Sequence, residues 1–246
     1  MAIDLKRLAQ FDTPTISNTI EVFEVRPRTA GYMDGRIRAC FPEMAPVVGY
    51  ASPATMRCAE PKASGDVYGS LDQQAARFAE LPGPAMVVFQ DLDDPPVAAT
   101  FGEIMCTTYQ SFGAVGLITS GAARDLDQVR RLGFAAFSNG ALCSHGYSHI
   151  VDLGGTVRVG GITIRAGDLI HADANGVCTI PAEIADQVAD AAVEFVAAEA
   201  LVLDYLKAGK PEPKAFAQAR AAMMDAIGVL GRRVRAAPVV DGHSKP

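Results

Sequence analysis

The sequence lacks the markers of several protein classes. It contains no tryptophan and only five cysteines, and the nearest two, Cys40 and Cys58, are 18 positions apart. Because no CxxC pair is present, neither a zinc knuckle nor a disulfide framework is expected, which fits a reducing cytoplasm. No apolar run approaches the ~18 residues of a membrane-spanning helix. The opening segment, MAIDLKRLAQFD, carries charges without an apolar stretch, so no signal peptide is predicted.

Positive charge is also scarce. The 22 Lys and Arg residues against 28 Asp and Glu residues give a formal net charge of −6. General binding to nucleic acid needs a basic face, so this balance excludes it. The sequence has no GxGxxG or GxxxxGK[ST] motif, so nucleotide-phosphate binding has no support. With 246 residues, 49% of them hydrophobic, the composition predicts a soluble globular protein of one large or two small domains.

Apolar runs that alternate with helical segments predict an α/β fold. The strands are expected at 47–58, 85–92, 115–120 and 134–137, and the helices at 66–80, 102–113 and 123–133. Strands separated by helices are typical of a parallel sheet covered by helices. Further along, Gly160 and Gly161 lie between two alternating runs and predict a β-hairpin.

The pattern changes after residue 181. One apolar stripe, with steps of four and three residues, runs from Ile184 to Tyr205, and a second begins at Phe216 and reaches Leu230. These stripes predict a pair of long amphipathic helices. We therefore divide the chain into an α/β domain, residues 1–181, and a C-terminal helical extension with its tail, residues 182–246. The extension is expected to belong to the same domain or to a subunit interface.

Chemically informative residues follow two neighbouring strands. Gly102 and Glu103 open the helix after one strand, and Arg124 and Asp125 follow the next. The first amides of a helix lack intrahelical acceptors and can hold a carboxylate. An arginine offers a two-pronged donor to an anionic group, and an aspartate offers an oxygen ligand to Mg²⁺. The alternative is that Arg124 and Asp125 are only the solvated start of a helix.

Twenty residues separate Glu103 from the pair Arg124-Asp125 within the segment GEIMCTTYQSFGAVGLITSGAARDLDQVRRLGF. This spacing resembles that of the RraA-like family. VRVGGITIRAGDLIHADANGVCTIP is similar to the closing segment of that family. The family includes divalent-metal 4-hydroxy-4-methyl-2-oxoglutarate aldolases and the RraA regulators of ribonuclease E. The resemblance covers roughly residues 45–181. It implies a layered α/β fold, with a central β-sheet core flanked by helices, that assembles as a homotrimer or homohexamer.

The same resemblance implies roles for individual residues. Those that would bind a pyruvoyl carboxylate or keto oxygen are Gly102, Glu103, Ile104, Met105 and Arg124. Asp125 would hold Mg²⁺ or Mn²⁺, with water completing much of the coordination shell. Arg124 and Glu103 would be catalytic, because an acid at the Glu103 position helps the aldolases to activate a water or a substrate hydroxyl.

Some residues depart from the family pattern or stand outside it. Ser120 stands where an Asp is common, and Asn175 replaces a commonly charged residue. The lost charges indicate an altered substrate or a reduced activity. His145 and His149 have the i, i+4 spacing of two metal ligands on a helix, although Gly146 between them favours a loop. The alternatives for this pair are a structural role and a lid that contacts substrate.

Two functions from different classes are compatible with these residues. Retro-aldol cleavage needs an electron sink, which is either a lysine Schiff base or a metal. None of the six lysines lies in an apolar strand, and Lys62 is the one remote candidate, so the metal is favoured. We expect a class II aldolase that cleaves a 4-hydroxy-2-oxo acid to pyruvate and a carbonyl product, with a possible oxaloacetate decarboxylase activity.

The alternative is a non-catalytic regulator of the RraA type, which binds a protein. The expected partners are a small 2-oxo acid and further copies of the chain, with no nucleic acid and no membrane, and the expected location is cytoplasmic.

Overall fold

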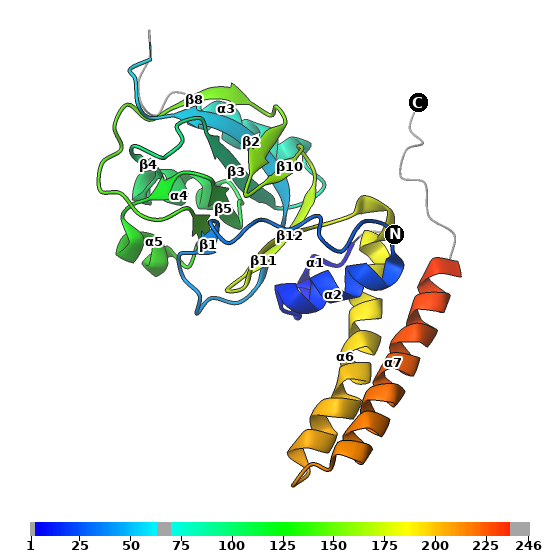
Figure 1. Cartoon of the computed structure of the whole chain (residues 1–246). Coiled ribbons are helices and arrows are strands. Elements are labelled where there is room, and N and C mark those ends of the chain that lie inside the picture. Colours follow the sequence, from blue (N-terminus) through cyan, green and yellow to red (C-terminus); the bar gives the residue numbers. More distant parts are fainter. Residues whose placement is uncertain (1–2, 63–69, 237–246) are drawn as a thin grey trace, which may run out of the picture. The chain divides into compact units, whose positions relative to one another are not determined.

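The computed structural model describes residues 3–62 and 70–236 (Figure 1). They form two compact units. One unit, Ala30–Ile180, contains the sheets, and the other combines Met1–Thr29 with Pro181–Pro246 and is helical where it is described. The boundary at Pro181 lies beside the one expected after residue 181. The N-terminal helices, which we assigned to the α/β domain, instead cluster with the C-terminal helices, because they pack against them.

A mixed sheet, with eight strands among the described residues, forms the centre of the first unit. The strand order is β1-β7-β5-β3-β2-β11-β12, and β8 pairs with β2 outside this order. A bridge between Tyr32 and Cys178 joins β12 to the segment before β1, so the sheet is nearly closed. The strands are β1 (Arg38–Ala39), β2 (Val47–Arg57), β3 (Ala85–Asp91), β5 (Gly116–Thr119), β7 (Ala135–Ser138), β8 (His149–Leu153), β11 (Leu169–Asp173) and β12 (Gly176–Ile180).

The strands β2, β3, β5 and β7 run parallel to one another, which confirms the predicted parallel layer. The remaining strands of this sheet pair in antiparallel fashion. Parallel strands end at the same edge of a sheet. The loops after β3, β5 and β7 therefore meet at one edge, where open α/β sheets usually bind their ligands.

Both faces of the sheet are buried, as the apolar runs predict. Val87 and Phe89 of β3 face a layer of helices, whereas Met86 and Val88 face the opposite side. The helices are α3 (Leu71–Ala76), with the 3₁₀ turn η1 (Arg77–Glu80) after it, α4 (Glu103–Ser111) and α5 (Leu126–Leu132). The opposite face is covered by the hairpin of β9 (Val157–Val159) and β10 (Ile162–Ile164) and by the segment around Met33. The layered α/β fold is therefore confirmed.

Local signals account for several turns. Gly160 and Gly161 have φ values of 55° and 81° in the β9–β10 turn, a combination that two-residue hairpins of the I′ type require. Gly133 ends α5 with φ 66°, which is the usual left-handed helix end. The helix expected at 66–80 begins at Leu71 in the structure, and residues 66–69 lie outside the described ranges.

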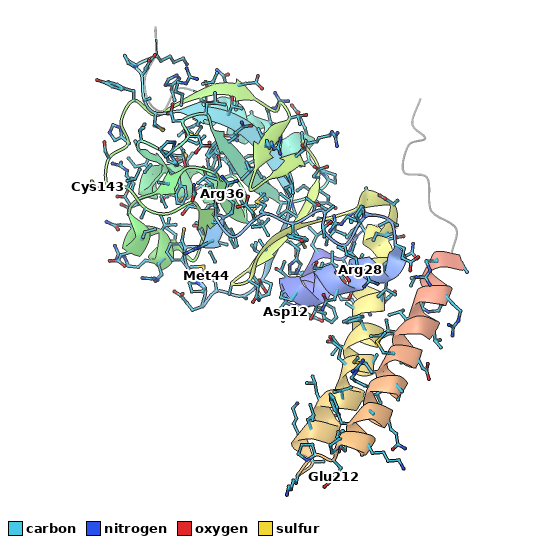
Figure 2. The ribbon with its side chains drawn as sticks, viewed as in Figure 1. Asp12, Arg28, Arg36, Met44, Cys143 and Glu212 are labelled. Atoms are coloured by element: carbon cyan, nitrogen blue, oxygen red, sulfur yellow. The ribbon has the colours of Figure 1, made fainter. Side chains whose placement is uncertain are left out.

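Four α-helices make up the described part of the second unit. They are α1 (Leu5–Leu8), α2 (Thr13–Phe23), α6 (Ala185–Lys207) and α7 (Pro213–Ala236), with the 3₁₀ turn η2 (Ala182–Ile184) before α6. The two long helices lie side by side as an antiparallel pair (Figure 1). Asp12, labelled in Figure 2, caps the N-terminus of α2, since its carboxylate accepts a hydrogen bond from the Thr15 amide at 2.7 Å.

No helix in residues 3–62 or 70–236 combines the length and apolar character needed to cross a membrane.

The apolar stripe of α6 is buried along its first half. The buried members are Ile184, Val188, Ala191, Phe195 and Ala198, and Val202 and Tyr205 are half-buried. Phe195 is 7% exposed and lies beside Val22 of α2 and Ile227 of α7. The ion pair between Glu24 and Arg235, at 2.8 Å, ties the end of α2 to α7 at the edge of the same contact.

Replacing Phe195 with Asp should therefore destabilise the helical unit. Truncating a buried Phe costs about 3–5 kcal/mol, and a buried carboxylate adds to this. At about 2–4 °C per kcal/mol, the melting temperature should fall by at least roughly 6 °C. The matched control is Val193→Asp, two residues earlier on the same helix, where the side chain is 48% exposed. Equal melting temperatures for the two variants would show that the stripe is not packed.

Candidate functional site

The predicted residues Gly102, Glu103, Arg124 and Asp125 lie together in the structure. Two short parallel strands, β4 (Ala99–Phe101) and β6 (Ala122–Ala123), end side by side and bring the following residues into contact. The Arg124 amide donates a hydrogen bond to the Phe101 carbonyl at 3.2 Å. The Glu103 amide donates to Asp125 Oδ2 at 3.1 Å, and Arg124 Nε lies 3.6 Å from the same oxygen.

Gly102 is required by this close packing. A Cβ at this position would lie 2.5 Å from Asp125 Oδ2 and 3.1 Å from Arg124 Nε. The contact with the carboxylate is shorter than any ordinary Cβ contact. The absence of a side chain at Gly102 therefore lets the Arg124 and Asp125 side chains come directly against the start of α4.

Asp125 has an unusual backbone conformation, with φ 54° and ψ 39°. Aspartate tolerates this left-handed region better than most residues do. Its side chain makes no capping bond to its own helix, α5, and instead accepts the first amide of α4. The side chains of Arg124 and Asp125 are 27% and 31% exposed. The pair is thus held by specific contacts, which differs from the solvated helix start that we considered as the alternative.

A small pocket of about 20 Å³ opens beside this pair. Its lining includes Gly102, Ile104, Met105 and Arg124, four of the residues predicted to bind substrate. The side chain of the fifth, Glu103, is exposed and does not line the pocket, and its backbone amide is already bonded to Asp125.

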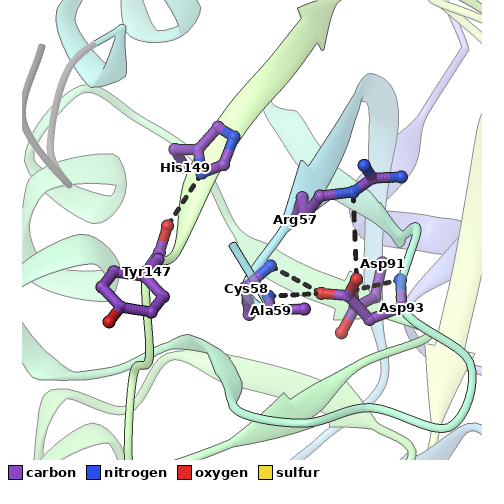
Figure 3. Close-up of polar contacts among 7 residues, drawn as sticks. All are labelled: Arg57, Cys58, Ala59, Asp91, Asp93, Tyr147 and His149. Carbon is purple, nitrogen blue, oxygen red and sulfur yellow. Dashed lines mark hydrogen bonds and ion pairs between the residues drawn. The ribbon is translucent and has the colours of Figure 1, made fainter. Parts of the chain in front are cut away.

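The two histidines with i, i+4 spacing belong to different sites. His145 lines the pocket beside Arg124, and its Nδ1 lies 2.8 Å from the Gly146 carbonyl oxygen. His149 starts β8, and its Nδ1 faces the Tyr147 carbonyl at 2.8 Å (Figure 3). A separate surface hollow of about 480 Å³ is lined by His149 together with Lys62, so the histidines do not converge on one ion.

A second group of polar side chains lies where β2 and β3 end, and we name Cys58, Asp91 and Asp93 the Cys58 cluster. One ligand atom from each residue lies within 4.8 Å of the others. Cys58 is 1% exposed and Asp91 is 7% exposed. Burial raises the pKa of Asp91 from 3.8 to about 6 and contributes most to raising the pKa of Cys58 to about 12. These donors are compatible with a divalent metal.

No role is predicted for this cluster from the sequence. Cys58 and Asp91 are 33 positions apart, and only the parallel pairing of Met56 with Asp91 brings them together. The available signal was the acidic run Asp91-Leu92-Asp93-Asp94 directly after a buried strand.

The two departures from the family pattern have clear places. The Asp91 amide donates a hydrogen bond to Ser120 Oγ at 2.9 Å, and both residues line a pocket of about 330 Å³. Asn175 lies in the turn between β11 and β12, where its amide and side chain both donate to Asp173. Ser120 is therefore next to the Cys58 cluster, and Asn175 stabilises a hairpin turn.

Comparisons with known proteins find relatives in sequence and in fold. A family model described as RraA-like, Aldolase/RraA, matches residues 13–179. A protein of Halalkalibacterium halodurans with the provisional name 4-hydroxy-4-methyl-2-oxoglutarate aldolase is 31% identical over 120 residues. That match covers 48% of this chain and 55% of the relative, so the chain spans about half the length of this curated relative.

Two solved structures share the fold. An uncharacterized protein from Pseudomonas syringae pv. tomato matches with a TM-score of 0.69 at 21% identity, over 88% of this chain and 92% of that one. The RraAS2 protein of Streptomyces coelicolor, described as an unusual member of the RNase ES inhibitor RraA protein family, has a TM-score of 0.63 at 20% identity. This second match covers 79% of this chain and 93% of that one.

Proposed function

This chain belongs to the RraA-like family, and from that premise we propose that it is an aldolase that releases pyruvate from a 4-hydroxy-2-oxo acid. The observation that supports the proposal is the meeting of Arg124, Asp125 and the start of α4 beside one pocket. A guanidinium, a carboxylate and helix N-terminal amides are the groups that a metal-assisted reaction of a 2-oxo acid requires.

The reaction breaks the bond between C3 and C4 of the substrate. The 4-hydroxyl loses its proton, the electrons of the broken bond move toward the C2 carbonyl, and an enolate and a carbonyl product result. Protonation of the enolate at C3 then gives pyruvate. Negative charge develops on the C2 oxygen, so a site that accelerates the reaction must stabilise charge there.

In this proposal, Arg124 and α4 bind the anionic end of the substrate. The amides of Ile104 and Met105 are in the first turn of α4, where helix amides lack intrahelical acceptors. The pocket of about 20 Å³ has the volume of one or two waters, so it takes a terminal group such as a carboxylate. The rest of the substrate would lie against Ile104, which is 58% exposed at the pocket.

Asp125 is the residue proposed to hold Mg²⁺ or Mn²⁺. Its carboxylate is a hard oxygen donor, and it is partly exposed, which suits an ion that keeps most of its water ligands. A bound divalent ion would supply Lewis-acid stabilisation of charge on the substrate oxygens. The Glu103 amide fixes the carboxylate through Oδ2, and Gly102 leaves the space for it.

His145 and Glu103 are the two side chains proposed to accept the proton of the 4-hydroxyl. His145 lines the pocket, and its Nδ1 must carry a hydrogen to bond the Gly146 carbonyl, which leaves Nε2 of the neutral ring as a proton acceptor. Glu103 is the second, although its exposed side chain does not line the pocket. Oxaloacetate passes through the same pyruvate enolate when it loses CO₂, so the site is also proposed to decarboxylate it.

The test is an assay of the purified full chain for pyruvate release. Oxaloacetate and a panel of 4-hydroxy-2-oxo acids are supplied with Mg²⁺, with Mn²⁺ and with EDTA. We expect pyruvate from at least one substrate with either metal and loss of the activity in EDTA. If neither metal supports pyruvate release from any substrate, the aldolase proposal fails and the protein-binding regulator takes its place.

A further inference from the structure

The Cys58 cluster is built by the sheet itself. β2 and β3 are parallel neighbours, and Met56 pairs with Asp91. Cys58 directly follows β2 and Asp91 ends β3, so a thiol and a carboxylate reach the same edge of the sheet. Asp93 follows two residues later and completes the group, with one ligand atom of each residue within 4.8 Å of the others (Figure 3).

Asp91 has an unsatisfied oxygen. Among the described residues, no group donates a hydrogen bond to Asp91 Oδ2, and the residue is 7% exposed. A buried carboxylate without a partner is costly, and in proteins such groups are paired with a cation or bind a metal. Arg57 lies 3.9 Å from Asp93 Oδ1, so its guanidinium is directed to Asp93 and not to Asp91 Oδ2 (Figure 3).

Two other carboxylate oxygens of the cluster accept hydrogen bonds from the backbone. The amides of Cys58 and Ala59 donate to Asp93 Oδ2 at 2.6 and 2.9 Å, and the Asp93 amide donates to Asp91 Oδ1 at 3.0 Å (Figure 3). Such contacts fix the orientation of metal-binding carboxylates in known sites. Asp91 and Asp93 also line the pocket of about 330 Å³, which gives an ion a route from solvent.

The donor set indicates the type of ion. Mg²⁺ and Ca²⁺ take oxygen ligands, whereas Zn²⁺ binds thiolate together with carboxylate. With a deprotonated Cys58, the three ligands carry three negative charges, which Arg57 and one divalent ion would balance. We propose that Cys58, Asp91 and Asp93 form a Zn²⁺-type site, separate from Asp125 and independent of the proposed aldolase activity. The thiol proton leaves to solvent when the ion binds.

Cobalt is the probe that tests this site, because Co²⁺ bound to a thiolate gives a charge-transfer absorption band that oxygen ligands do not produce. The full chain is freed of metal with a chelator, the chelator is removed, and Co²⁺ is titrated. We expect a thiolate band that saturates at one equivalent per chain and disappears when Zn²⁺ is added. Cys58→Ser should abolish the band, and Asp91→Asn should weaken Co²⁺ binding by at least about tenfold.

Two variants serve as controls. Cys143, which is exposed and is labelled in Figure 2, lies outside the cluster, so Cys143→Ser should keep the band. Asp125→Asn should also keep it, which separates this site from the proposed aldolase metal. Zn²⁺ should raise the melting temperature of the wild-type chain but not of Asp91→Asn, a result that holds even if Cys58→Ser folds poorly. The absence of a thiolate band in the wild-type chain, or its survival in Cys58→Ser, would overturn the proposal.

Discussion

Arg124→Lys should lower kcat/KM for pyruvate formation by about two to three orders of magnitude, although the positive charge is kept. The planar guanidinium can donate two parallel hydrogen bonds, which a lysine ammonium cannot reproduce. In the structure, Arg124 is held on both sides, since its amide is bonded to Phe101 and its Nε lies 3.6 Å from Asp125 Oδ2. A lysine would present a single mobile ammonium group in place of this fixed guanidinium.

The measurement compares initial rates of the wild-type chain and Arg124→Lys with saturating Mg²⁺. Arg130→Lys is the matched control, because Arg130 lies in α5, is 48% exposed and pairs with Glu43 and Asp127 outside the pocket. The control should keep the wild-type rate. If Arg124→Lys keeps it as well, Arg124 does not act on the substrate.

The second large effect is expected at Asp125. Asp125→Asn should reduce pyruvate formation by roughly a thousandfold or more, because losing the carboxylate would remove several kcal/mol of charge stabilisation from the metal proposed to bind there. Asparagine is a better choice than alanine here, since φ is 54° at this position and Asn tolerates that conformation. Its side-chain oxygen can still accept the Glu103 amide, so the start of α4 should remain intact.

Asp127→Asn provides the comparison for Asp125→Asn. Asp127 lies two residues further on, in the first turn of α5, and its side chain is 78% exposed. The Asp127→Asn variant should keep both the activity and the melting temperature of the wild-type chain. An Asp125→Asn variant with wild-type activity would contradict the assignment of the metal to Asp125.

The sequence predicted the parallel half of the sheet because its signals are local. β3, β5 and β7 are short apolar runs, the helices between them have the apolar spacing of α4 and α5, and Gly133 ends α5 at a left-handed φ. The antiparallel half depends on pairing between distant segments, such as Tyr50 with Leu169. Period-two patterning does not specify such partners, so this part of the sheet order could not be predicted.

The polar sites also divide into a part that the sequence predicts and a part that it does not. Arg124 and Asp125 could be placed near Gly102 from sequence, because the segments after β3 and β5 of the parallel layer meet at one edge. The short strands β4 and β6, which directly precede these residues, were not predicted. The Cys58 cluster could not be placed, because it depends on the register between β2 and β3. The histidine pair shows the limit of spacing alone, since Gly146 breaks the helix that i, i+4 geometry assumes and only His145 reaches the pocket.

The most direct test of the proposed aldolase site is calorimetric titration of the full chain with Mg²⁺ in the presence of oxalate, an analogue of the pyruvate enolate. Oxalate would add two oxygen ligands to an ion held by Asp125, so the wild-type chain should bind Mg²⁺ with oxalate more tightly than without it. Cys58→Ser should behave as the wild type, and Asp125→Asn should show only background heat. A wild-type chain that binds neither Mg²⁺ nor Mn²⁺ with oxalate present would contradict the metal-dependent aldolase.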